Sequence, residues 1–387
     1  MQAMRWLIFF LLGTGSCLVS RAQEAAAGAE VLRASTSFSG YVSTGYHLGS
    51  SAGSYNYSFA SANNNGFSLD HIGLSLSRPL EDYLLDSGFR FDVWVGPQAS
   101  ELGTSDDSGD SVSIRRAYID LRLPWINPLA WDLSEVGSSI DLRVGTFDSL
   151  LGLESPDPVD NPHYTRSWAY SIQPTMHTGV LAVFPGFGRP GVDPLFEWDS
   201  SYQFSLGLVN SVEPRISGAP VNSDRKSLLT GFTWELPSFF GPAGGSRLSL
   251  GYLNGRDLSG VDPVQNIFGS LGLALPSDLW SLALTYDSRV LHGAGNDDTV
   301  LGAHLGYQAT EKLRLHLRGE FFQEGAQLFS GESAGEQSDG QGITATAEYQ
   351  LWESVLSRLE YRWDHTDLRV NNRHNTQAWH LNIIYKF

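Results

Sequence analysis

The sequence predicts an all-β protein, a single transmembrane antiparallel β-barrel of about 14 or 16 strands. Three observations support this prediction. Short segments along most of the chain alternate apolar and polar residues, which gives a strand one apolar and one polar face. The apolar faces carry aromatic residues near their ends, as expected where a barrel meets the two membrane interfaces. Beyond the first residues, no apolar run reaches about 18 residues, the length typical of a membrane helix.

The C-terminal segment AWHLNIIYKF shows the alternation most clearly. One face is apolar and aromatic at both ends: Trp379, Leu381, Ile383, Tyr385 and Phe387. A final strand of this kind with a terminal Phe resembles the outer-membrane proteins of Gram-negative bacteria, whose assembly machinery reads it. We therefore expect the outer-membrane lipid bilayer and, through Phe387, the barrel-assembly machinery as partners.

Fifteen segments alternate in this way. They lie near residues 37–48, 67–79, 88–95, 112–123, 141–147, 177–185, 200–210, 227–236, 246–254, 278–287, 299–308, 313–321, 341–350, 358–364 and 378–387. Because single-chain bacterial barrels normally have an even number of strands, one prediction is missing or wrong. A soluble β-sandwich also alternates, but the mixed charges on the polar faces and the aromatic strand ends favour the barrel.

Low-complexity stretches separate several of these segments. Stretches rich in Gly, Ser, Asn and Asp predict long extracellular loops at 50–66, 97–110, 292–300 and 330–342. Short breaks such as 308–312 predict periplasmic turns, the asymmetry usual for outer-membrane barrels.

The N-terminus predicts export. Residues 1–22 combine Arg5, an apolar run over 6–12 and the small residues Ser20 and Ala22, which is typical of a cleaved signal peptide. Residues 23–35 are expected to form a short tail, and 36–387 the barrel. The single cysteine, Cys17, follows Gly15 and Ser16, so lipidation of Cys17 is the alternative left open.

The net charge of the chain limits the classes of partner that it can bind. Lysine and arginine total 25 against 42 acidic residues, a formal charge of −17, which argues against nucleic acid. The polar strand faces nevertheless carry both signs, either as cross-strand pairs that brace the barrel or as groups that orient solutes. The expected pore-lining residues are Arg90, Asp92, Arg116, Asp120, Arg122, Asp141, Arg143, Arg314, Arg318, Glu320, Glu348, Arg358, Glu360, Arg362 and Asp364.

Residues 148–176 interrupt the alternation. Pro156, Pro158 and Pro162 limit the flexibility of this segment, and it is too long for a turn. A barrel of this size has a wide polar lumen, so we predict that the segment folds into the lumen and constricts it. A loop folded over the outer mouth is the alternative. The expected constriction residues are Glu154, Asp157, Asp160, His163, Arg166 and His177.

The stretch GTFDSLLGLESPDPVDNPHYTRSWAYSIQPTMHTGV (145–180) resembles the signature of the Bbp2-type β-barrel porins. Thr165 stands where that family usually has Ser. The matching positions are Gly152, Glu154, Ser155, Pro156, Asn161, Tyr164, Arg166, Ser167, Pro174, His177, Thr178, Gly179 and Val180. The segments LEYRWDHTD and IIYKF also resemble that family's last two strands. The resemblance implies an outer-membrane barrel with a porin-like role and no catalytic residue.

The predicted function is passive diffusion of small hydrophilic solutes and ions through a water-filled barrel, narrowed by the 148–176 loop. A non-conducting structural or adhesin-type barrel is the alternative. An enzyme is not expected, because HExxH does not occur and no Gly-x-Ser-x-Gly elbow appears: the two matches, at 49–53 and 331–335, fall in low-complexity stretches and not between a strand and a helix. No cofactor or metal is expected, and the sequence leaves a homotrimer open.

Overall fold

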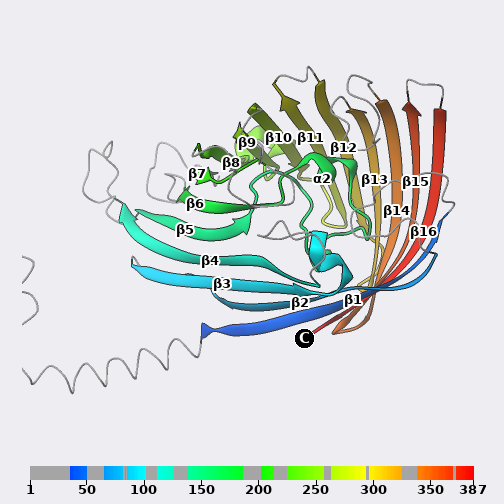
Figure 1. Ribbon diagram of the computed structural model, residues 1–387, viewed down its shortest axis with the longest axis horizontal. Coiled ribbons are helices and arrows are strands. Elements are labelled where there is room, and N and C mark those ends of the chain that lie inside the picture. The colour runs from blue at the N-terminus through cyan, green and yellow to red at the C-terminus, as the bar shows by residue number, and fades with distance from the viewer. Residues whose placement is uncertain are drawn as a thin grey trace, which may run out of the picture.

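The structure is a computed structural model. It describes residues 35–49, 65–81, 83, 85–101, 111–125, 138–185, 202–212, 225–256, 263–292, 296–324, 338–368 and 372–387. Sixteen antiparallel strands form a closed barrel in which β1 pairs with β16 (Figure 1). The predicted signal peptide and most of the predicted tail lie outside the described residues. Within the described part of the chain, no helix is long and apolar enough to cross a membrane.

In chain order the strands are β1 (Ser37–Gly49), β2 (Gly66–Arg78), β3 (Asp86–Val95), β4 (Val112–Trp125), β5 (Ser138–Asp148), β6 (Met176–Pro185), β7 (Tyr202–Val209), β8 (Ser227–Glu235), β9 (Arg247–Arg256), β10 (Pro263–Leu273), β11 (Trp280–Leu291), β12 (Asn296–Gln308), β13 (Leu313–Glu324), β14 (Ser338–Trp352), β15 (Val355–Leu368) and β16 (Asn372–Lys386). Short helices are η1 (Pro97–Glu101), η3 (Pro158–Asp160), α2 (Trp168–Ile172) and η4 (Ser238–Ala243).

The predicted all-β barrel is confirmed, and its strand number is the larger of the two expected. All fifteen predicted strands are present, and the missing one is β10. The interior-facing Phe268 is 3% exposed, and it follows the exposed Ile267. Apolar residues on both faces hide the alternation, which explains the omission.

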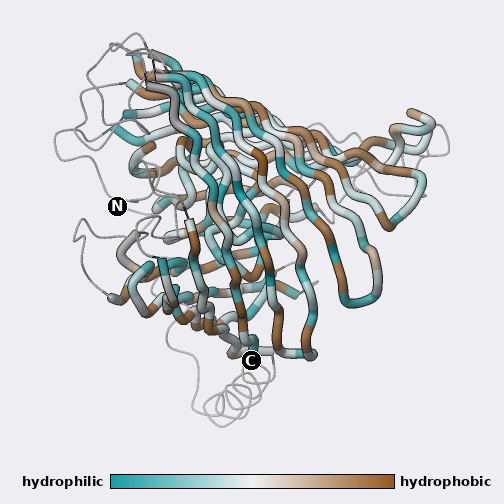
Figure 2. Tube along the Cα trace, turned by 90° about the vertical axis from the view of Figure 1, so that its right-hand side faces the viewer, coloured by the Kyte–Doolittle hydropathy of each residue, from teal (hydrophilic) through white to brown (hydrophobic). Residues whose placement is uncertain are grey.

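Hydrophobic and hydrophilic residues alternate along the strands of the barrel (Figure 2), and many of the large apolar side chains are exposed on its outer face. Along β16, exposed Trp379, Leu381 and Ile383 alternate with buried His380 and Asn382, as the sequence predicts. The backbones of Gly40 and Phe387 exchange two hydrogen bonds of 2.9 Å, so the terminal residue itself extends the β1–β16 pairing. A closed sheet leaves no edge strand in the lipid.

The connections differ in length at both ends of the barrel. The predicted turn at 308–312 lies between β12 and β13, and β14 and β15 are separated only by 353–354. At the same end, the connections 126–137 and 186–201 are longer than a turn. Two predicted loops are partly strand, because β12 begins inside 292–300 and β14 begins inside 330–342.

Two β-bulges bring extra polar residues to the interior. Asp92 pairs with Arg116 while Val93 pairs with Ile114, which leaves Arg115 as an additional residue in β4. The shift between Ser43 and Thr44 likewise leaves Asp70 unpaired beside His71 in β2. A bulge interrupts the alternation of side chains. Consecutive residues, Arg115 with Arg116 and Asp70 with His71, therefore all contact interior groups.

We expect Gly145→Ala to destabilise the folded barrel by about 2 kcal/mol or more. Gly145 pairs with Gly179 where β5 meets β6, and its φ is 132°. An added Cβ would lie 2.2 Å from the Ala117 carbonyl oxygen, which is backbone and cannot move aside. Urea unfolding followed by tryptophan fluorescence measures the loss. Gly319→Ala is the matched control, because nothing lies within 4 Å of its added Cβ. Equal midpoints for both variants would contradict this account.

Candidate functional site

The connection between β5 and β6, residues 149–175, folds into the barrel, and we call it the inner loop (Figure 1). Its ends differ by one residue from the predicted interruption, because Asp148 and Met176 belong to the strands. Pro158 begins η3, and the hydroxyl of Ser167 caps α2 by accepting from Tyr170 N at 3.0 Å.

Polar residues inside the inner loop fix its shape. Ser155 N donates to Asn161 Oδ1 at 2.9 Å, and Asn161 Nδ2 donates to the carbonyls of Ser155 and Asp157 at 2.6 and 2.8 Å. Arg166 is buried and donates to the carbonyl of Pro156 at 2.8 Å. Arg166 therefore supports the loop's own backbone, and Asn161 and Ser155 do the same. All three belong to the recognised sequence signature.

Buried ionic groups of β13 and β15 hold one side of the inner loop. Glu360 accepts from the backbone N–H groups of Tyr164 and Thr165 at 2.6 and 3.0 Å, and from the Thr165 hydroxyl at 2.6 Å. Arg318 pairs with Glu154 at 2.6 Å and donates to the Thr165 carbonyl at 3.0 Å. Glu360 and Arg318 are 0% exposed, so polar groups of the loop, together with Glu320 beside Arg318, take the place of water around these charges.

The same wall makes five further contacts. Arg358 donates to the carbonyls of Pro158 and Asn161 at 2.9 and 2.5 Å. Arg362 donates to the carbonyl of Arg166 at 2.5 Å. Glu320 and Asp364 accept from the backbone and indole N–H groups of Trp168 at 2.7 and 2.9 Å.

Asp157 holds the loop to the opposite wall. Its carboxylate accepts from Arg116 at 2.9 Å, from Tyr41 at 3.0 Å and from Trp94 Nε1 at 3.1 Å, with Arg115 at 3.6 Å. Burial raises the pKa of Asp157, but Arg115 and Arg116 outweigh that effect and hold it at about 2. Both arginines also pair with Asp148, so each cation lies between two carboxylates.

Tyr164 adds a third polar attachment. Its hydroxyl donates to Asp70 at 2.7 Å, and its ring stacks on His47 at 5.5 Å. The Nδ1 atoms of His47 and His380 are 2.9 Å apart, which joins β1 to β16 beneath the loop. Gln173 Nε2 donates to Asp287 on β11 at 2.5 Å.

The β6–β10 sector contacts the loop through apolar groups. Leu151 lies in a buried cluster with side chains of the six strands β5 to β10 and with Val212, which follows β7; the strand residues are Phe147, Leu181, Val209, Leu229, Leu253, Val264 and Phe268. The loop approaches glycines, since a Cβ on Gly231 would lie 2.8 Å from Leu150 and one on Gly251 would lie 3.0 Å from Leu151. The inner loop thus contacts residues on every side of the barrel.

The other predicted residues occupy different places. Arg122 with Asp141, and Arg143 with Asp120, form two cross-strand ion pairs between β4 and β5 at 2.7 and 2.8 Å. Within the described part of the chain, four of the remaining predicted residues each have one side-chain partner in a hydrogen bond or ion pair: Arg90 pairs with Asp92, Glu348 pairs with Arg358, Arg314 bonds Gln308, and His177 in β6 bonds Ser149. Asp160 is exposed.

Sequence reasoning missed Arg115, Asp70, Tyr41, Trp94 and Asp287 as partners of the loop, and Asp148 as the partner of Arg115 and Arg116. Simple alternation assigns Arg115 to the lipid face, and only the bulge turns it inward. Among the described residues, no group of three or more His, Cys, Asp and Glu could hold a metal ion.

Cavities remain around the inner loop. One of about 510 Å³ lies between Pro162, His163 and the wall of β10–β13. Another of about 190 Å³ is lined by residues 148–149, 151–156 and 173–175. A third, of about 230 Å³, lies beside Tyr41, Asp157 and Phe387.

Acid should weaken the docking of the inner loop at His163. Burial, followed by Arg318, His316 and His304, lowers the pKa of His163 well below 6.5. A released loop would regain the ordinary pKa of about 6.5, so protonation favours release. Docking is then at full strength above about pH 6.5 and loses up to about 1.4 kcal/mol per pH unit below it. The loss ends at the lowered pKa of docked His163.

Bilayer recordings at pH 7.5 and 5 check this expectation. His163 Nδ1 lies 2.8 Å from the Thr346 hydroxyl and 3.8 Å from Glu360, and its ring lies 6.0 Å from His316. We expect larger, noisier currents at pH 5, and we expect His163→Gln to remove most of the difference. The same pH response in wild type and His163→Gln would contradict the role of His163.

A closed barrel with an apolar exterior and an inward-folded loop defines a porin-like outer-membrane β-barrel. The chain belongs to a β-barrel porin family: the family model described as "Putative beta-barrel porin-2, OmpL-like" matches residues 35–387. This confirms the resemblance inferred from residues 145–180. No curated protein matches the chain.

Solved structures share the fold. The outer-membrane channel DcaP of Acinetobacter baumannii has a TM-score of 0.57 at 13% identity, covering 91% of this chain and 97% of that one. OmpF of Salmonella typhi, in complex with daunomycin, has a TM-score of 0.58 at 14% identity, covering 91% of this chain and 97% of that one. OmpT of Vibrio cholerae in its trimer form gives 0.52 at 12%, covering 91% and 99%.

Proposed function

We propose that this porin-like channel conducts small hydrophilic solutes and ions by passive diffusion, through a lumen that the inner loop narrows. The attachment of the loop to opposite walls by buried ion pairs is the observation that supports this proposal most strongly. Separating a buried ion pair leaves an uncompensated charge and costs several kcal/mol, so we expect the loop to stay in place and to keep the cross-section of the lumen constant. The cavities of about 510 and 190 Å³ beside it are the spaces a solute would enter.

Charges line these spaces and set the expected preference. Ion selectivity in pores comes from charged side chains at the narrowest part. Glu154 and Asp157 are neutralised by Arg318 and Arg116, and Asp160 and the β4–β5 ion pairs remain partly accessible to water. We infer weak ion selectivity, with size as the main filter.

Further parts of the proposal concern export and assembly. Family membership supports an outer-membrane location, and we propose that residues 1–22 are removed on the way. We also propose that the barrel-assembly machinery reads the strand that ends at Phe387. The trimer form of the similar OmpT supports a homotrimer as the assembly to test first. No catalytic role is proposed.

A non-conducting structural or adhesin-type barrel is the second candidate. One observation favours it: the inner loop contacts every side of the barrel, as a plug would.

Planar-bilayer recording of the refolded chain from Gln23 onward separates the two functions. Discrete conductance steps support the channel, and their dependence on salt type measures its selectivity. Chemical crosslinking of the same preparation measures the oligomeric state. Barrels that fold, as shown by heat-modifiable gel mobility, but give no steps would support the non-conducting alternative.

A further inference from the structure

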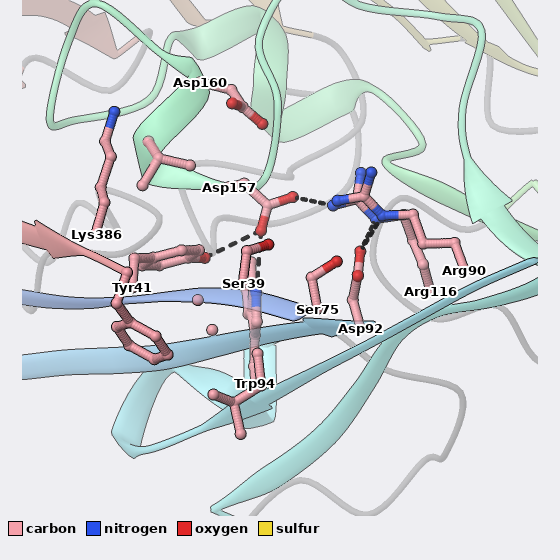
Figure 3. Close-up of a pocket in the computed structure, with 15 residues that line it drawn as sticks. Ser39, Tyr41, Ser75, Arg90, Asp92, Trp94, Arg116, Asp157, Asp160 and Lys386 are labelled. Atoms are coloured by element: carbon pink, nitrogen blue, oxygen red, sulfur yellow. Dashed lines mark hydrogen bonds and ion pairs between the residues drawn. The ribbon is translucent and has the colours of Figure 1, made fainter. Parts of the chain in front are cut away.

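A charged cavity of about 230 Å³ lies at the end of the barrel that carries Phe387; we call it the terminal cavity (Figure 3). The inner loop closes one side of it, and strands β1–β4 with the end of β16 form the rest. The polar residues that the argument uses are Arg90, Asp92, Arg116, Asp157, Asp160 and Lys386.

Most of these charges neutralise one another. Arg116 pairs with Asp92, Asp148 and Asp157, and Arg90 pairs with Asp92 at 2.8 Å. The second oxygen of Asp157 accepts from Tyr41 and Trp94. These groups build the wall of the terminal cavity.

Three polar groups on the wall of the terminal cavity are left without a partner among the described residues: the side chains of Asp160 and Lys386, and one oxygen of Asp92. Asp160 and Lys386 form no ion pair or side-chain hydrogen bond with any residue that the structure describes. They extend from different elements, Asp160 from the inner loop and Lys386 from β16, as Figure 3 shows. Asp92 is 3% exposed, and its Oδ1 atom has no hydrogen-bond partner in the described structure.

Asp92 Oδ1 is closed to solvent, so it adds negative potential to the wall beside the cavity and makes no direct contact with a ligand. The exposed Asp160 carboxylate can accept from a cationic or N–H donor in the cavity. The half-buried Lys386 ammonium can pair with an anionic acceptor there. Leu74, Trp94, Val159 and Phe387 add apolar surface to the same cavity.

We propose that the terminal cavity binds small zwitterions, namely α-amino acids with a short apolar side chain. The ligand carboxylate pairs with Lys386, and the ligand ammonium pairs with Asp160. A cation alone would leave Lys386 unpaired, and an anion alone would leave Asp160 unpaired. This inference names a solute class for the channel and so rests on the proposed function for its physiological role, although binding itself can be measured without it.

Three compounds of one chain length test the charge pattern. Norvaline is the zwitterion, pentanoate lacks its ammonium, and pentylamine lacks its carboxylate. Titration calorimetry on the refolded full barrel in detergent should give norvaline an affinity about tenfold or more above both others, the usual size of one charged hydrogen bond. Pentanoate or pentylamine binding as tightly as norvaline would overturn the proposal.

Variants assign the two ends of the ligand. Asp160→Asn should weaken norvaline and pentylamine and leave pentanoate unchanged. Lys386→Met should weaken norvaline and pentanoate and leave pentylamine unchanged. Glu311→Gln and Lys312→Met, in the turn between β12 and β13, are the matched controls and should change nothing. If Lys386→Met fails to fold because it lies in the last strand, Asp160→Asn alone decides. Unchanged norvaline affinity in Asp160→Asn would refute the site.

Conductance separates this inference from the proposed function. Channel steps without norvaline binding would remove the zwitterion site and leave the channel intact. Selective norvaline binding without channel steps would keep the site and remove the diffusion function.

Discussion

Deleting residues 155–172 raises the expected single-channel conductance several-fold over wild type. The deletion removes η3, α2 and the segment attached to Glu360, Arg358 and Arg362. It keeps Leu150 and Leu151, which pack on the glycines of β8 and β9. Without the loop, a sixteen-strand barrel has a wide aqueous lumen, and the freed charges face water instead of remaining buried.

Gln173, at one cut end, has its side chain beside Gly152, two residues before the other cut end: a Cβ on Gly152 would lie 2.2 Å from the Gln173 side-chain oxygen. A short Gly-Ser link joins Glu154 to Gln173 in the deletion variant. A second variant, with 155–172 replaced by Gly-Ser residues of equal number, is the matched control for loss of anchoring alone. We expect it to give raised but fluctuating currents. Equal conductance in all three proteins would place the inner loop outside the conduction path.

Asp157→Asn is expected to cost about 3 kcal/mol, because it removes one of the carboxylates that Arg115 and Arg116 share and leaves one buried positive charge unbalanced. Arg115 is 0% exposed and has no access to water in compensation. We expect one side of the inner loop to detach, with frequent current fluctuations and a lower urea midpoint.

Asp120→Asn is the control for Asp157→Asn. Asp120 also pairs with an arginine, Arg143, at 2.8 Å, but the Arg143 side chain is 33% exposed. Exposed pairs contribute about 1 kcal/mol or less. Similar losses in both variants would show that Asp157 holds the loop no more strongly than an ordinary wall pair.

The contributions of Asp157 and His163 to loop docking are expected to differ in their dependence on pH. A carboxylate with a lowered pKa stabilises the docked loop above its ordinary value of about 3.8 and loses that effect as the pH falls toward about 2. Contacts of Asp157 therefore persist at pH 5, where the docking of His163 is already weakened. The response of wild type between pH 7.5 and 5 should survive in Asp157→Asn.

Strand positions were predictable because one apolar face in lipid imposes a period of two. The same rule failed where two faces were apolar, at Phe268 in β10, and where a bulge added a residue, at Arg115 in β4. In both cases a local feature, either a second apolar face or an extra residue, hides the alternation from which strands are predicted.

The inner loop could be located from its break in alternation and its prolines, whereas its partners could not be assigned. Glu154 reaches Arg318 and Asp157 reaches Arg116 across large sequence separations. Such pairings depend on how far the chain curves into the lumen, which no short pattern encodes. Membership of the signature also gave no indication that Arg166 supports the loop backbone instead of facing the channel.

The attachment of Tyr164 has a consequence for biogenesis. Its ring contacts both His47 and His380, which belong to the first and last strands, and its own backbone N–H and that of Thr165 bond Glu360 on the last strand but one. Because these contacts need β1, β15 and β16 in place together, the loop cannot complete them until the two ends of the sheet meet. Closure of the seam and seating of the loop are thus a single late event. A barrel whose folding stopped before β15 was paired would have an open interior and a loop without its contacts to Glu360, Arg358 and Arg362.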